Sequence, residues 1–72
     1  MHAGMHQKFV WEIVNQELVI GCADRRLGEL LRLPAEMRFN NDEQATWFAQ
    51  GRIDMHIDEL QAKEETLRQA RE

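Results

Sequence analysis

The sequence predicts an α+β fold in which a β-hairpin near the N-terminus is covered by helices. Residues 9–22 alternate strongly apolar and mixed positions about a central Asn15-Gln16 pair, as two paired strands do. Residues 43–72 instead carry apolar side chains at helical spacing, with opposite charges four residues apart. An all-α chain of three helices is the alternative, because the apolar run of residues 9–22 also fits a helical period.

The expected hairpin has one strongly apolar face. Folding the segment about Asn15-Gln16 brings three pairs together on that face, namely Phe9 with Cys22, Trp11 with Ile20 and Ile13 with Leu18. Aromatic and β-branched residues favour strands. The turn lacks the glycine that a two-residue type I′ turn prefers. A face this apolar needs a cover, which the rest of the chain has to supply.

A short helix is expected over residues 25–32. Asp24 can cap it, because its carboxylate can accept a hydrogen bond from a free amide of the first turn. Leucines gather on one side of this helix. Pro34 stops it, since the residue before a proline is disfavoured in the helical conformation. Gly28 inside the segment lowers its helix propensity by roughly 1 kcal/mol relative to alanine.

A long C-terminal helix is expected to start at residues 40–43, Asn-Asn-Asp-Glu. Asn40 or Asn41 can cap it, and Glu43 can reach back toward Asn40 as in a capping box. Gly51 leaves two interpretations open. Either it ends the helix and residues 52–58 form a third strand, or the helix continues to the C-terminus, intact or slightly broken. Favourable charge pairs four residues apart support the second.

The apolar stripe of this helix has one interruption. Its apolar members are Ile53, Ile57, Leu60 and Leu67. Glu64 lies on the same stripe as a polar gap. The neighbours Trp47 and Phe48 cannot both face one core squarely, because adjacent helical positions diverge. Either one of the two packs inside and the other lies in a subunit contact, or a wide apolar face leaves both partly buried.

A single domain accounts for all 72 residues, with frayed ends expected at residues 1–6 and 69–72. A core of this size is marginally stable, because ordering the chain costs about 1.5 kcal/mol per residue. The one cysteine, Cys22, excludes an internal disulfide, and no zinc-type spacing of cysteine and histidine occurs. Association into a homodimer is therefore the expected additional support.

Charge and hydropathy restrict the partners. The formal net charge is −4, which argues against broad binding to nucleic acid, because that depends on clustered Lys and Arg. No apolar run approaches the roughly 20 residues that span a bilayer. The first residues lack a basic leader followed by an apolar segment, and a single thiol fits a reducing compartment. We expect a cytoplasmic protein with no membrane partner.

No catalytic, cofactor-binding or metal-binding motif stands out. Cys22 would face the apolar side of the hairpin, where a thiol is a poor nucleophile. The one local cluster resembling metal ligands is Asp54, His56 and Asp58, and on a helix His56 points away from the other two. The sequence has no serine and no phosphate-binding glycine loop. We therefore expect no enzyme, no cofactor and no metal.

The expected function is that of a small acidic, non-enzymatic protein that binds another protein, as a modulator or inhibitor of a larger machine. Tryptophan is enriched at interface hot spots, and a row of carboxylates suits a basic surface on a partner. The candidate partner surface consists of Trp47, Asp54, Asp58, Glu59, Glu64 and Glu65.

The alternative function is a small DNA-binding regulator or antitoxin. Its candidate phosphate contacts are Arg25, Arg26, Arg32 and Arg38. Arginines gathered on one exposed face would favour DNA binding. Arginines scattered, or paired with acids such as Glu29 and Glu36, would favour protein binding.

Overall fold

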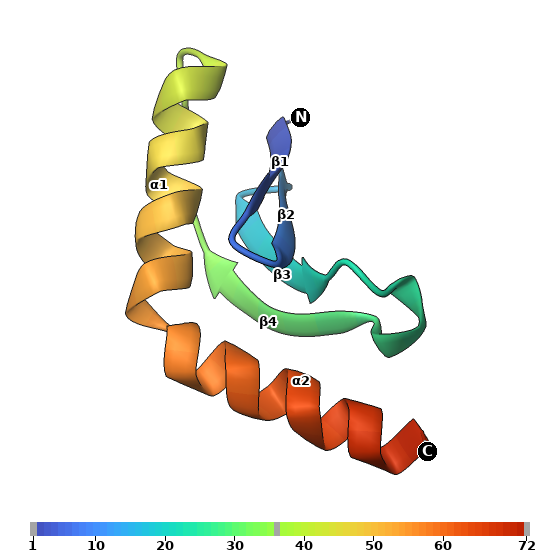
Figure 1. Cartoon of the computed structure of the whole chain (residues 1–72). Helices are drawn as coiled ribbons and strands as arrows, with labels where there is room; N and C mark the ends of the chain where they lie inside the picture. Colours follow the sequence, from blue (N-terminus) through green and yellow to red (C-terminus); the bar gives the residue numbers. More distant parts are fainter. Residues whose placement is uncertain (1, 36, 72) are drawn as a thin grey trace.

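The computed structural model describes residues 2–35 and 37–71, without the side chains of Arg25 and Arg71. A four-stranded antiparallel sheet is followed by two helices (Figure 1). The elements are β1 (His2–His6), β2 (Phe9–Val14), β3 (Glu17–Cys22), a 3₁₀ turn (Arg25–Leu27), β4 (Glu29–Pro34), α1 (Asp42–Met55) and α2 (Ile57–Arg71). The α+β class is confirmed, and the all-α alternative is wrong.

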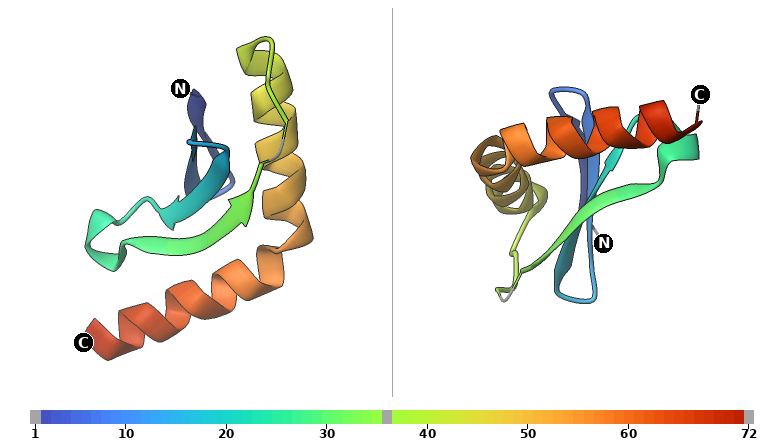
Figure 2. Two further views of the ribbon diagram at one scale, coloured as in Figure 1. Left: turned by 180° about the vertical axis from the view of Figure 1, so that it is seen from behind. Right: turned by 90° about the horizontal axis from the view of Figure 1, so that it is seen from below.

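The sheet is strongly twisted, and the two helices frame it. Its strand order is β1-β2-β3-β4, and β4 runs obliquely to the hairpin of β1 and β2 (Figure 2). The helices meet at a bend and form an L (Figure 1). Helix α1 packs mainly against β1, and α2 packs mainly against β4. The inner face of the sheet therefore lies in the angle between the helices.

The predicted hairpin is confirmed, including its register. Trp11 pairs with Ile20, and the two flanking pairs are also those expected. The inward side chains of β2 and β3 are buried. Asn15 and Gln16 have φ angles of 52° and 64°. The turn is therefore made by two left-handed residues without glycine, a conformation that asparagine tolerates better than most residues.

The short helix expected after Asp24 is wrong, because the segment forms one 3₁₀ turn and then strand β4. Asp24 does cap the turn, since its Oδ1 accepts the Arg26 amide at 3.1 Å. Gly28 then takes a φ of 73°, which ends the turn. Leu31 and Leu33 pair with inward residues of β3. Their alternation is the strand signal that the helical interpretation overlooked.

The N-terminal residues, expected to be frayed, form an edge strand paired with β2. Met1 lies outside the described residues. His2 Nδ1 lies 2.5 Å from Asp42 Oδ1, and His6 Nε2 lies 2.9 Å from Asp54 Oδ1. Both histidines therefore connect β1 to α1. At the other end of the chain, residues 69–71 belong to the last turn of α2, and residue 72 is outside the described part.

The predicted C-terminal helix is divided into two pieces at His56. Gly51 lies inside α1, so the third-strand interpretation is wrong. The cap is Asn41 rather than Asn40, and its Oδ1 accepts the Gln44 amide at 2.9 Å. Gln44 Oε1 in turn accepts the Asn40 amide at 3.2 Å. Gln44 therefore takes the place expected for Glu43, and its side chain bonds the residue before the cap instead of the cap itself.

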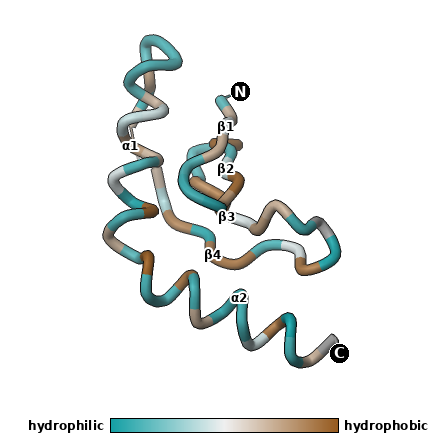
Figure 3. Tube along the Cα trace, in the orientation of Figure 1, coloured by the Kyte–Doolittle hydropathy of each residue, from teal (hydrophilic) through white to brown (hydrophobic). Residues whose placement is uncertain are grey.

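The core lies between the inner sheet face and the helices. Figure 3 shows hydrophobic residues recurring along β2, β3 and β4 and more sparsely along the helices. Helix α1 contributes Ala45, Ala49 and Ile53, all fully buried. Two alanines on this face allow the helix to lie close to β1 and β2, because their side chains are short. The opposite side of α1 is left facing solvent.

Candidate protein-binding surface

Trp47 is the large hydrophobic side chain that the described structure exposes most. It is 79% exposed and projects from α1, away from the buried alanines. Its neighbour Phe48 turns toward Phe39, with ring centroids 5.3 Å apart. The expectation that the two aromatics separate, one packed and one available, therefore fits this arrangement. An isolated exposed tryptophan would need no explanation, but this one borders a groove.

The groove lies between α1 and the segment 37–39 that precedes it. A pocket of about 770 Å³ is lined by Met37, Phe39, Trp47 and Phe48, together with polar residues at the start of α1. A second pocket of about 320 Å³ shares Met37 and Phe48 and ends at Pro34 and Arg52. The two pockets lie on either side of the side chains that they share, and we call them together the α1 groove. Trp47 could be identified from the sequence as a partner-surface residue, but the groove beside it could not.

The α1 groove carries opposite charges near its two ends. Glu43 lines it at the start of α1, and Arg52 lines it near the end of α1. The Arg52 guanidinium lies 5.0 Å from the Phe48 ring centroid, a cation–π arrangement that holds the charge over the groove. Within residues 2–35 and 37–71, neither Glu43 nor Arg52 is within ion-pair distance of an opposite charge.

The other acidic residues predicted for the partner surface, Glu64 apart, are exposed. Asp54 lies on α1 and accepts hydrogen bonds from His6 and from Gln7 Nε2, the latter at 3.0 Å. The His6 contact lowers the pKa of Asp54 below its ordinary value. On α2, Glu59 contacts His56 at 3.2 Å, whereas Asp58 and Glu65 face solvent. Asp54 shares the outer side of α1 with Trp47.

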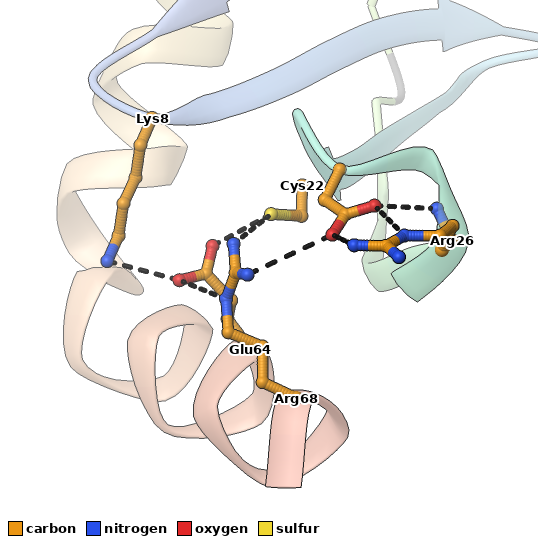
Figure 4. Close-up of polar contacts among 6 residues, drawn as sticks. Lys8, Cys22, Arg26, Glu64 and Arg68 are labelled. Carbon is orange, nitrogen blue, oxygen red and sulfur yellow. Dashed lines mark hydrogen bonds and ion pairs between the residues drawn. The ribbon is translucent and has the colours of Figure 1, made fainter. Parts of the chain in front are cut away.

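Glu64 is not part of that exposed surface, because its side chain is buried and only 6% of the residue is exposed. The Cys22 thiol donates a hydrogen bond to Glu64 Oε2 at 2.9 Å (Figure 4). Lys8 Nζ lies 3.2 Å from Glu64 Oε1, and Arg68 Nε lies 3.7 Å from it. The Cys22 hydrogen bond is the main cause that lowers the pKa of Glu64, and Lys8 and Arg68 add to it.

Glu64 therefore links α2 to the sheet through its contacts with Cys22 and Lys8. The sequence signal was present, because Glu64 interrupts the apolar stripe of the helix. Its partner Cys22 could not be found in the same way, since the two residues are 42 positions apart.

The arginines of the alternative DNA-binding surface are partly neutralised by carboxylates. Arg26 forms two hydrogen bonds to Asp24, at 3.1 and 3.0 Å, and these lower the pKa of Asp24 to about 2. Arg32 contacts Glu29 at 2.8 Å and Glu17 at 3.2 Å. Arg38 is exposed on the segment before α1. The side chain of Arg25 lies outside the described part of the structure.

The histidines of the described residues contact carboxylate side chains. Within residues 2–35 and 37–71, no three His, Cys, Asp or Glu side chains gather closely enough to hold a metal ion. In the Asp54, His56, Asp58 cluster, Asp54 turns to His6 and His56 turns to Glu59. No helix in the described residues has both the length and the apolar character needed to cross a membrane.

Comparison of the chain with protein-family models, with curated proteins and with solved structures found no match.

Proposed function

We propose that this chain is a small, non-enzymatic protein that binds another protein and modulates or inhibits a larger machine. The observation that carries the proposal is the exposure of Trp47 beside the apolar α1 groove. Exposed apolar surface of this kind commonly marks an interaction site, and tryptophan dominates the binding energy of many interfaces. The exposed carboxylates of Asp54 and Asp58 add a negative margin that suits a basic partner.

The pairing of the arginines supports protein binding over the DNA-binding alternative. Arg26 and Arg32 already contact carboxylates of their own chain, so binding phosphates would require these contacts to be exchanged. The formal net charge of −4 acts in the same direction. We retain a cytoplasmic location in the proposal on the basis of the single free thiol of Cys22.

A homodimer is part of the proposal, because a domain this small gains stability from association. Met5 and Val10 are exposed on the outer face of the sheet, opposite the helices, and give a second copy an apolar surface separate from the α1 groove. Light scattering at high micromolar concentration tests the dimer. A monomeric mass would remove this part without affecting the rest.

The experiment for the function is affinity capture from a lysate of the source cells, followed by mass spectrometry. Wild-type protein and the Trp47→Ala variant are immobilised in parallel, with Gln61→Ala, an exposed position of α2 outside the candidate partner surface, as a control. We expect a protein that wild type and Gln61→Ala retain and that Trp47→Ala loses.

Trp47→Ala should leave the free energy of unfolding within about 0.5 kcal/mol of wild type, because surface substitutions rarely cost more. A lost partner then reflects the surface and not the fold. Identical capture by wild type and Trp47→Ala would contradict the proposal. Salt-sensitive binding to random duplex DNA that is lost in Arg26→Ala would favour the alternative.

A further inference from the structure

We propose that the α1 groove receives an amphipathic helix of another protein, with apolar side chains flanked by a carboxylate at one end and a cation at the other. This inference rests on the proposed function and specifies the chemistry of the partner. It follows from three features of the groove, which are its apolar lining, its walls of helix and irregular chain, and the charges at its ends.

The lining suits large apolar side chains. Met37, Phe39, Trp47 and Phe48 contribute it. Two of these four, Met37 and Trp47, are more than half exposed, so a ligand that covers them removes apolar surface from water. Methionine adapts its shape to different ligands, and the aromatic rings provide flat contact areas.

The walls of the groove favour a helical ligand. One wall is the helix α1, and the other is the segment 37–39, which is not part of a β-strand. An extended peptide would meet a strand only at Pro34, the last residue of the edge strand β4, and proline has no backbone N–H to offer for pairing. A helix satisfies its own backbone and presents side chains to the groove.

Arg52 is placed to receive a carboxylate. Three other arginines, Arg26, Arg32 and Arg68, contact carboxylates of the chain. Arg52 instead stacks on Phe48, and its Nη1 has only the Met55 Sδ, at 3.3 Å, as a partner among the described residues. A guanidinium held over a ring can bind a carboxylate through two parallel hydrogen bonds.

Glu43 is placed to receive a cation. It lines the opposite end of the groove and is exposed. Glu43 and Arg52 are separated by nine positions of α1, which corresponds to roughly 13–14 Å along the helix axis. A helix lying along the groove would match both charges if its own carboxylate and cation were about nine residues apart.

The test uses a displayed library of random peptides about 16 residues long, roughly four helical turns. Binders to wild type are selected and then counter-selected on Trp47→Ala. We expect the enriched peptides to carry apolar residues between an acid and a base, and to become helical on binding, as circular dichroism reports.

Charge reversal on the best peptide makes the test specific. Arg52→Glu should weaken its binding roughly fivefold to tenfold, and replacing the peptide's acid with lysine should restore it. Glu43→Arg should weaken binding similarly, and replacing the peptide's base with glutamate should restore it. Glu12→Arg, at an exposed position of β2 outside the α1 groove, is the matched control and should change nothing.

Several results would overturn the inference. These are a library that yields no Trp47-dependent binder, peptides that bind in extended form, and charge reversals that have no effect or are not rescued. If wild type forms a dimer that Trp47→Ala abolishes, the groove is occupied by a second copy of this chain, and the inference is also wrong.

The outcomes separate the inference from the proposed function. Trp47-dependent capture from the lysate without charge-reversal rescue would leave the function standing and reject the helix. Loss of Trp47 dependence in the lysate would reject the function itself.

Discussion

The buried carboxylate of Glu64 gives the sharpest stability prediction, through the substitution Glu64→Gln. The variant keeps the shape of the side chain. It also keeps an oxygen that can accept a hydrogen bond from the Cys22 thiol. It removes the negative charge that Lys8 and Arg68 face at 3.2 and 3.7 Å. The perturbation therefore isolates ionisation from packing.

The expected cost is about 1–2 kcal/mol at pH 7, from two contributions. A hydrogen bond to a charged acceptor is worth about 1.5–3 kcal/mol and a neutral one about 1 kcal/mol. Lys8 and Arg68 are each about half exposed, so solvent screens their ion pairs and each adds less than about 1 kcal/mol. Relief of the desolvation of a buried charge offsets part of the loss.

The pH dependence has a definite sign. The pKa of Glu64 in the folded protein lies below its ordinary value of 4.5, mainly because of the Cys22 hydrogen bond. The ionised side chain therefore stabilises the fold above about pH 4.5, and this contribution is lost as the pH falls through the lower, folded-state pKa. Glu64→Gln lacks the contribution at every pH, so the two stability curves should converge in acid.

Urea unfolding monitored by the fluorescence of the buried Trp11 measures both effects, between pH 7 and pH values well below 4.5. Glu65→Gln is the matched control, because Glu65 is the exposed next residue, and it should follow wild type. Equal unfolding free energies of wild type and Glu64→Gln at pH 7, with parallel acid limbs, would refute the role assigned to Glu64.

Two further pairs of variants test the backbone. Gly4→Ala should cost about 1–3 kcal/mol, because its Cβ would lie 2.8 Å from a ring atom of Trp11. Gly51→Ala, with open space around it, should instead stabilise α1 by about 0.5–1 kcal/mol. Equal thermal unfolding temperatures of the two variants would contradict this. Asn41→Ala should cost about 1 kcal/mol through the lost cap, and Asn40→Ala should cost clearly less, since only its backbone amide takes part in the cap. Equal losses in urea unfolding would show that the cap was assigned wrongly.

The register of the hairpin could be read from the sequence, because it depends on alternation within one short segment. Trp11 and Ile20 are opposite each other in any fold that turns at Asn15-Gln16. The start of α1 could be read to within one residue for a similar reason, since capping uses neighbours in the chain. These features are local, and local patterning determined them.

Strand β4 was misread because its leucines suit a helix and a strand equally well over so few residues. The neighbour β3 decided the choice, since pairing with β3 packs Leu31 and Leu33 against the core, where both are partly buried. The edge strand β1 was missed because its residues have weak strand propensity. As with β4, neighbouring elements decide its conformation, here through pairing with β2 and contacts to α1.

The binding surface also has one part that the sequence predicts and another that depends on tertiary contacts. Trp47 was identified from the sequence, because an aromatic pair on a helix cannot be wholly buried on one face. The burial of Glu64 depended on Cys22, which is 42 positions away in the chain. The surroundings of Arg52 depended on how the chain folds back at Met37. Burial and pairing are properties of surfaces brought together by folding, so only the tertiary structure could decide them.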